Sequence, residues 1–238
     1  MSRLFEELDY RETEIGPLSL RRRRDLATGN DLHEIKLGDE FLMSSQFTAS
    51  EIALARLGVA EVACSEPLDV VVGGLGLGYT ALEVLQHDNV AALLVVDALE
   101  AVIDWHRTHL LPLGERLTGD PRCRFVHGDF FKLAASDAGF DEAHPRRCFH
   151  AILVDIDHSP DALLNPANGA FYQPEGLRRL AVHLHPGGVF ALWSNDRPDL
   201  RFTDRLAGVF ASARAETVTF PNPLQGNEFT QTVYLARK

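Results

Sequence analysis

Glycine and acidic residues follow several β-rich apolar runs in this 238-residue sequence, where they could contact a ligand. The first run, residues 69–72, leads into a turn that contains Gly73, Gly74, Gly76 and Gly78 just before a helical segment. Glycine lets the backbone approach a ligand closely and adopt dihedral angles that a β-carbon would forbid. Such a turn indicates a nucleotide-type ligand, although glycine-rich turns also follow many other strands.

Three further runs end in carboxylates. Asp97 comes about twenty residues after the glycine turn, where a carboxylate can accept both hydroxyls of a ribose. Asp129 offers an acceptor for an adenine amino group, Phe130 offers an aromatic face beside the ring, and Asp155 ends the fourth run. Each aspartate alone could cap a helix or form a turn. Together they predict an adenosine site at the carboxyl edge of a sheet.

Parallel strands joined by crossover helices would bring these positions to one edge. The apolar pattern predicts strands at 69–72, 92–96, 123–126, 149–154, 189–193, 216–220 and 230–236, and helices at 80–86, 99–109, 172–184 and 199–213. Residues 221–229 are too few for a helical crossover, so the last two strands should pair antiparallel. This reversal is typical of class I methyltransferase-like domains.

Residues 1–46 are predicted to form a small N-terminal β-hairpin module, with strands at 17–23, 32–37 and 40–43. Residues 47–238 would form a Rossmann-like nucleoside-binding catalytic domain that begins with a helix at 47–57. Thr48 could cap this helix, with Glu51 as its capping-box partner. Exposed edges of the module could pair with a second copy, so a homodimer is possible.

The composition limits the classes of molecule that the protein is expected to bind. The chain has 23 basic and 34 acidic residues, a net charge of −11, which repels nucleic acid and favours cationic or neutral small molecules. No apolar run reaches the eighteen or so residues of a membrane helix, and the start lacks a signal-peptide pattern, so we expect a cytoplasmic protein without membrane association. Three cysteines without a Cys-x-x-Cys pair, and ten histidines without ligand spacing, predict no metal site.

From about residue 32 to the carboxyl terminus, the sequence resembles the spermidine synthases, the polyamine aminopropyltransferases. The shared motifs are Gly38-Asp39-Glu40-Phe41, Gly73-Gly74, Gly128-Asp129, Asp155, Phe171-Tyr172 and Pro186-Gly187-Gly188. The resemblance implies an α/β, class I S-adenosylmethionine-dependent methyltransferase fold with a seven-stranded, mostly parallel sheet behind an N-terminal β module. It also implies that Asp129 holds the adenine amino group and that Asp155 lies beside the transferred group. Asp97 stands where the family usually has glutamate.

Some positions depart from the family pattern. Gly76 replaces an aspartate that would contact the primary amine of a decarboxylated donor and repel a methionine carboxylate, so ordinary S-adenosylmethionine becomes admissible. His158 stands where the family has the aspartate that deprotonates the attacking amine; Asp157 or His158 could still serve as base. Met43 and Ser45 replace a tyrosine and a glutamate of the hairpin.

Three functions follow as hypotheses. The first is methyl transfer from S-adenosylmethionine to a small amine or other cationic acceptor. The alternatives are aminopropyl transfer from decarboxylated S-adenosylmethionine and a nucleoside-binding protein without catalysis; a nicotinamide-dependent oxidoreductase is disfavoured by the terminal strand reversal. In either transfer, Asp155, Asp157 and His158 are the predicted catalytic residues, because an ammonium must lose a proton before it attacks. Tyr79 and Tyr172 are predicted to line the pocket.

Overall fold

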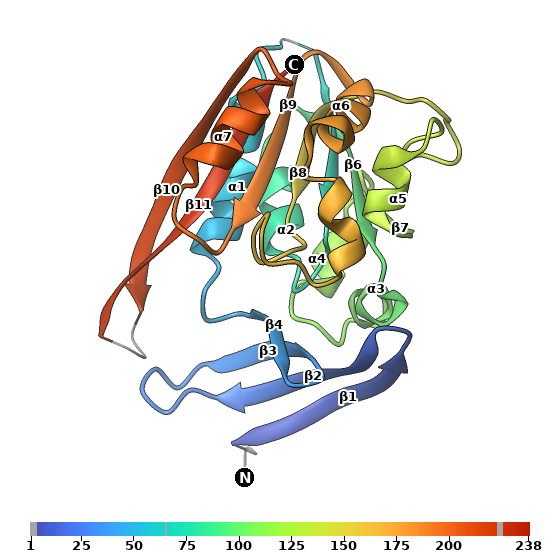
Figure 1. Ribbon diagram of the computed structural model, residues 1–238. Coiled ribbons are helices and arrows are strands. Elements are labelled where there is room, and N and C mark those ends of the chain that lie inside the picture. Colours follow the sequence, from blue (N-terminus) through green and yellow to red (C-terminus); the bar gives the residue numbers. More distant parts are fainter. Residues whose placement is uncertain (1–3, 65, 223–225) are drawn as a thin grey trace.

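The computed structural model describes residues 4–64, 66–222 and 226–238, which form two sheets (Figure 1). A four-stranded antiparallel sheet comes first along the chain, and a seven-stranded sheet covered by helices follows. The N-terminal sheet lies below the carboxyl ends of the central strands in Figure 1.

The central sheet has the order β10-β11-β9-β8-β5-β6-β7. β5 to β9 pair parallel, and β11 is antiparallel to both β9 and β10, so six of the seven strands point the same way. This order confirms the predicted class I methyltransferase fold. The strands are β5 (Leu68–Gly73), β6 (Val90–Asp97), β7 (Cys123–His127), β8 (Phe149–Val154), β9 (Leu184–Ser194), β10 (Ser212–Asn222) and β11 (Asn227–Arg237).

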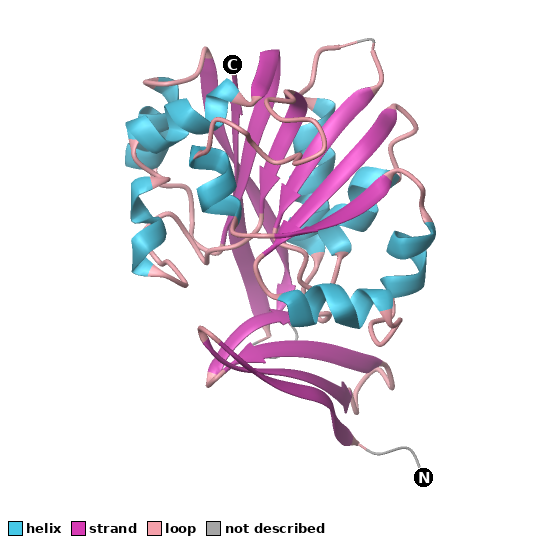
Figure 2. Ribbon diagram, turned by 90° about the vertical axis from the view of Figure 1, so that its right-hand side faces the viewer, coloured by secondary structure: helices cyan, strands magenta, loops and turns pink. Residues whose placement is uncertain are grey.

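Helices cover both faces of this sheet (Figure 2). One face packs against α1 (Ala49–Ala60), α2 (Tyr79–Leu85), α3 (Glu100–Arg107) and α4 (Gly114–Gly119). The other packs against α5 (Phe130–Ala135), α6 (Pro174–Val182) and α7 (Leu200–Ala207), while a short 3₁₀ helix spans Pro166–Ala170. Successive side chains of β5 alternate between the two hydrophobic layers, Val70 and Val72 on one face and Val71 on the other. The strands are therefore buried on both faces, as a parallel sheet requires.

The N-terminal module is a four-stranded sheet of consecutive neighbours: β1 (Phe5–Thr13), β2 (Gly16–Arg24), β3 (Asp31–Leu37) and β4 (Glu40–Ser44). The sequence predicted the last three strands and missed β1. Leu18, Leu20 and Ile35 are buried in the same hydrophobic cluster as Leu54 of α1. The sheet thus packs directly against the central domain.

Several predicted helices end earlier in the structure than the sequence suggested. The predicted helix 199–213 stops at Ala207, because Ser212 already starts the outer strand β10. The predicted helix 172–184 becomes α6, which ends at Val182, and Leu184 starts β9. Thr48 precedes α1 without a side-chain capping bond, so the predicted capping box with Glu51 is wrong. No helix in the described part of the chain is long and apolar enough to cross a membrane.

Candidate functional site

The glycine turn lies at the carboxyl end of β5, against the residue that follows β8. Gly74 has φ +93°, and a β-carbon there would overlap the carbonyl oxygen of Asp155. Gly76 has φ +46° and Gly78, the residue before α2, has φ +92°. Non-glycine residues are strained in this left-handed region. The turn therefore keeps its shape because glycine occupies these positions.

Asp97 holds the glycine turn from the end of β6. Its Oδ2 accepts the Leu75 backbone N–H at 2.8 Å and its Oδ1 accepts the Leu99 N–H at 2.8 Å. The Gly128 N–H donates to the Asp97 carbonyl at 3.0 Å, which places the end of β7 alongside. Burial raises the pKa of Asp97. Each carboxylate oxygen has a second acceptor position, so the group suits the ribose hydroxyls of a nucleoside.

Asp129 follows β7 and caps α5. Its Oδ1 accepts the Phe131 and Lys132 N–H groups at 3.0 and 3.1 Å, and Oδ2 lies 3.2 Å from Lys132 Nζ. Phe130 differs from the prediction: its side chain is 2% exposed and stacks on Phe140 with ring centroids 5.0 Å apart. Phe130 therefore belongs to the core beneath Gly73 and presents no open face to an adenine.

Asp155 follows β8 directly and lies beside Gly74. Thr80 Oγ1, from the first turn of α2, donates to Asp155 Oδ2 at 2.7 Å. Burial raises the pKa of Asp155 to about 6. The carboxyl group thus lies between the glycine turn and the start of α2.

Glu51, which the sequence analysis assigned to a helix cap, faces Asp155 instead. Its side chain is buried, and Ser50 Oγ donates to Glu51 Oε2 at 2.7 Å. Burial, and then the negative charge of Asp155, raise the pKa of Glu51 to about 8. Glu51 shares the buried face of α1 with Leu54, Ala55 and Gly58. This i, i+3, i+4, i+7 spacing was visible in the sequence and would have identified a glutamate on an apolar stripe.

The two residues predicted as possible bases, Asp157 and His158, lie in the loop after β8. Asp157 is buried, with Oδ2 accepting the Tyr172 hydroxyl at 2.7 Å and Oδ1 accepting the Leu164 N–H at 2.8 Å. His158 Nε2 lies 2.8 Å from Glu40 Oε1 of β4 and so joins the loop to the N-terminal sheet. Tyr172 is 1% exposed, which corrects its predicted place on a pocket wall.

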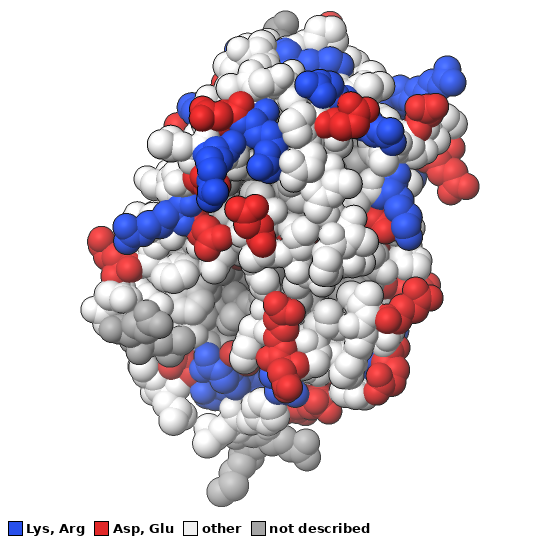
Figure 3. Space-filling model, in the orientation of Figure 1, with Lys and Arg blue, Asp and Glu red and all other residues white. Residues whose placement is uncertain are grey.

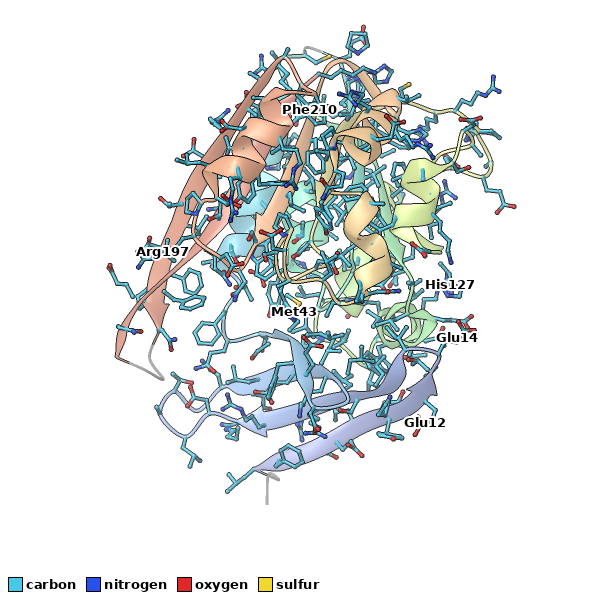
Figure 4. The ribbon with its side chains drawn as sticks, viewed as in Figure 1. Glu12, Glu14, Met43, His127, Arg197 and Phe210 are labelled. Carbon is cyan, nitrogen blue, oxygen red and sulfur yellow. The ribbon has the colours of Figure 1, made fainter. Side chains whose placement is uncertain are left out.

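Tyr79 and Met43 flank the glycine turn. The half-buried Tyr79 begins α2 and shares a side-chain hydrogen bond with Ser45, and burial raises its pKa. Met43 extends its sulfur from β4 toward the central domain (Figure 4), and its Sδ accepts the Leu77 N–H at 3.2 Å. Met43 Sδ also lies against Gly76. A thioether thus occupies the space above the position from which the family's aspartate is missing.

His106 supports the turn from α3 and was not identified in the sequence. Its side chain is fully buried, with Nε2 2.9 Å from the Gly76 carbonyl oxygen. Burial lowers the pKa of His106 to about 4, so the imidazole is neutral near pH 7 and Nε2–H donates to this carbonyl. Only the long-range packing of α3 against the turn reveals this contact.

The site is acidic. In the ion pairs formed by the described residues, no lysine or arginine partners Glu51, Asp97 or Asp155. Figure 3 shows acidic and basic side chains interspersed on one face of the molecule, without a broad basic surface. A ligand group near Glu51 and Asp155 therefore meets carboxyl groups rather than cations.

One group of residues could hold a metal ion away from this site. Ligand atoms of Cys64, Glu66 and His150 lie within 4.8 Å of one another. His150 Nδ1 already accepts the Asp69 N–H at 3.0 Å. The group lies at the starts of β5 and β8, the opposite edge of the sheet from Asp155, so it has no part in the candidate site. The absence of a metal site remains a prediction.

Fold and site together define a class I methyltransferase-like protein with an N-terminal β module. The spermine/spermidine synthase domain matches residues 57–221, so the chain belongs to the spermine/spermidine synthase family. It is similar to solved spermidine synthases: one in complex with the transition-state analogue AdoDATO (TM-score 0.74, 20% identity) and one from Thermotoga maritima (TM-score 0.73, 19% identity). These matches cover 98% of this chain and 73% and 72% of those chains.

Sequence alignments with curated relatives cover a smaller part of the chain. The chain is 29% identical over 169 residues to polyamine aminopropyltransferase 2 of Pseudomonas aeruginosa, covering 68% of this chain and 45% of that protein. It is 32% identical over 126 residues to a polyamine aminopropyltransferase of Aeropyrum pernix, covering 52% and 36%. It is 31% identical over 123 residues to putrescine N-methyltransferase 2 of Nicotiana attenuata, covering 52% and 30%. The match thus spans less than half the length of each of these relatives.

Proposed function

We propose that this protein transfers the aminopropyl group of decarboxylated S-adenosylmethionine to a small cationic amine. The supporting observation is the pair of neighbouring carboxyl groups, Glu51 and Asp155, beside the glycine turn with no basic partner. The carboxylate of ordinary S-adenosylmethionine would meet these acids, whereas the decarboxylated donor presents an ammonium. The first hypothesis from the sequence, methyl transfer, rested on the carboxylate missing at Gly76, whereas Glu51 adds a carboxyl group near Asp155 from another element.

The glycine turn and two acids suit the nucleoside part of the donor. In the proposed complex, Asp97 would accept the ribose hydroxyls and Asp129 the adenine amino group. Gly74 lies directly against the Asp155 backbone, so the donor's sulfonium end would lie close to Asp155. The protein then aligns the two reactants and excludes water, which are the main requirements of such a displacement.

Methyl transfer from S-adenosylmethionine to an amine is a second candidate. Two observations favour it: Gly76 leaves the glycine turn without its own carboxylate, and four putrescine N-methyltransferases are among the similar proteins. The two reactions use one fold and differ in the sulfonium substituent that is attacked.

A direct assay separates these candidates. The purified protein is incubated with putrescine and either donor, and the products are identified by mass spectrometry. We expect aminopropylated putrescine from the decarboxylated donor, and calorimetry should show that it binds at least about tenfold more tightly than S-adenosylmethionine, a difference of about 1.4 kcal/mol. Methylated putrescine, formed only from S-adenosylmethionine, would instead establish the second candidate.

Two variants test whether the turnover belongs to this site. Asp155→Asn keeps the side-chain shape and should lower kcat by about a hundredfold or more, because the group lies beside the reacting atoms. Glu142→Gln, at an exposed position in the loop before β8, is the control and should behave as wild type. Nucleoside binding without turnover of either donor would favour the non-catalytic alternative.

A further inference from the structure

The attacking amine needs a proton acceptor, and both predicted candidates in the loop after β8 already hold partners. Asp157 Oδ1 and Oδ2 both accept hydrogen bonds from within the loop and Tyr172. His158, which stands at the position of the family's base, is held 2.8 Å from Glu40 and is 30% exposed at the junction with the N-terminal sheet. A carboxyl group on another element, with fewer partners, is therefore a further candidate.

Glu51 is the carboxyl group that the structure adds next to Asp155. It comes from the first turn of α1, and α1 packs across β8, β9 and β11. Its side chain is 7% exposed, and the Ser50 hydroxyl donates to its Oε2. Burying a carboxyl group without a cationic partner costs free energy. A position with only a structural role would not need a glutamate there. Such groups concentrate at functional sites.

We infer that Glu51, acting as a pair with Asp155, is the catalytic base that deprotonates the acceptor amine. This inference rests on the proposed function and replaces Asp157 and His158 as base. Asp155 and Tyr79 are the titratable groups that face Glu51, the first from the end of β8 and the second from the start of α2. Thr80 and Ser50 contribute hydroxyl groups that hold the two carboxyl groups in place.

The proton and electron count follows from this pair. The ammonium of the acceptor gives one proton to the carboxylate pair and becomes a neutral amine. Its nitrogen lone pair then forms a bond to the propyl carbon next to the sulfonium, and the carbon–sulfur bond breaks with its electrons remaining on sulfur. The products are a protonated secondary amine and a neutral thioether nucleoside, and the pair releases its proton to solvent.

The pair is suited to this step near neutral pH. Burial raises the pKa of Asp155 to about 6 and that of Glu51 to about 8, so the two carboxyl groups together hold about one proton at pH 7 and can accept a second. The rate constant kcat/KM for the amine should rise with pH as the pair loses protons between about 6 and 8. The upper part of this rise should depend on Glu51.

The test compares wild type with Glu51→Gln, Glu51→Asp and the exposed control Glu142→Gln. With decarboxylated S-adenosylmethionine and putrescine, we expect Glu51→Gln to lower kcat about a hundredfold and to remove the upper part of the pH profile. Glu51→Asp should restore part of the rate, and the dissociation constant for methylthioadenosine, which lacks an ammonium, should change less than about threefold. A Glu51→Gln protein within threefold of wild type in kcat, with an unchanged pH profile, would overturn the inference.

A second readout does not depend on turnover. Calorimetry of putrescine binding in the presence of methylthioadenosine, in two buffers of different ionisation enthalpy at pH 7, gives the number of protons released. A cationic amine favours the fully ionised pair, so wild type should release protons and Glu51→Gln distinctly fewer. Equal release by the two proteins would reject Glu51 even if neither donor is turned over, which separates this result from failure of the proposed function.

Discussion

At the scale of single residues, the site depends on carboxyl groups that have different tasks. Asp97 and Asp129 accept backbone N–H groups and so shape the turn and the start of α5. Glu51 and Asp155 face each other, and burial raises the pKa of both. Burial also raises the pKa of Asp97, so the backbone contacts set Asp97 and Asp129 apart as framework acids, and Glu51 and Asp155 are the acids that we propose exchange protons.

The elevated pKa of Glu51 makes stability depend on pH. A carboxyl group whose folded-state pKa lies above its unfolded value binds protons more tightly in the folded state. Its contribution to stability is complete below about pH 4.5 and is lost as the pH rises through about 8. In urea titrations, the free energy of unfolding of wild type relative to Glu51→Gln should thus fall by on the order of 3 kcal/mol across this range. Parallel pH curves for the two proteins would contradict this assignment.

At the scale of elements, the glycine turn and the end of β8 are built as one unit. The Asp155 N–H donates to the Gly73 carbonyl at 2.8 Å, and Gly74 lies against the Asp155 carbonyl. The start of α2 adds Thr80, which holds the Asp155 side chain. We therefore expect any movement of the glycine turn to move Asp155 with it.

Gly74→Ala should damage this unit. The new methyl group would overlap the Asp155 carbonyl at φ +93°, so we expect a loss of on the order of 3 kcal/mol in thermal or urea unfolding and weaker donor binding by calorimetry. Gly119→Ala is a matched control, because its β-carbon meets nothing within 4 Å. The two variants should differ clearly; equal stability would show that the turn relaxes freely.

The sequence predicted the central sheet because each strand is a short apolar run followed by a turn or a helix stop. It missed β1, since Phe5–Thr13 is a charged edge strand in which apolar residues do not alternate regularly. It predicted that the acids would gather at one edge, because parallel strands bring their carboxyl ends together. The partner of Glu51 could not be predicted, since that contact depends on how α1 lies across the sheet.

At the scale of the whole molecule, the N-terminal sheet is part of the fold rather than an appendage. Trp105 of α3 is fully buried, and its Nε1 donates to Asp9 Oδ2 of β1 at 2.6 Å. Arg11 bridges Asp9 and Asp104 at 2.8 and 3.0 Å. Polar contacts at β1 and a shared apolar cluster at β2 and β3 thus join the two sheets, whereas the boundary at residues 46 and 47 remains a prediction from sequence.

Asp9→Ala tests this connection. It would leave the buried Trp105 N–H without an acceptor, so the free energy of unfolding should fall by about 1–3 kcal/mol. Glu12→Ala, at an exposed position on the same strand, should change it by less than about 0.5 kcal/mol. Because the core is shared, Asp9→Ala should still unfold in one transition by both fluorescence and circular dichroism. Two separate transitions would show that the sheets fold independently.

The contact between Met43 and the glycine turn means that oxidation of Met43 can be used to detect a nucleoside bound at this turn. The chain has only two methionines, Met1 and Met43, so a gain of one oxygen on the peptide containing Met43 can be assigned by mass spectrometry. Oxidation makes a thioether polar, and its rate follows access of peroxide to sulfur. A nucleoside bound over the turn would shield this sulfur, so saturating donor should slow sulfoxide formation at Met43 several-fold. The footprint would report binding of any candidate donor before its chemistry is known.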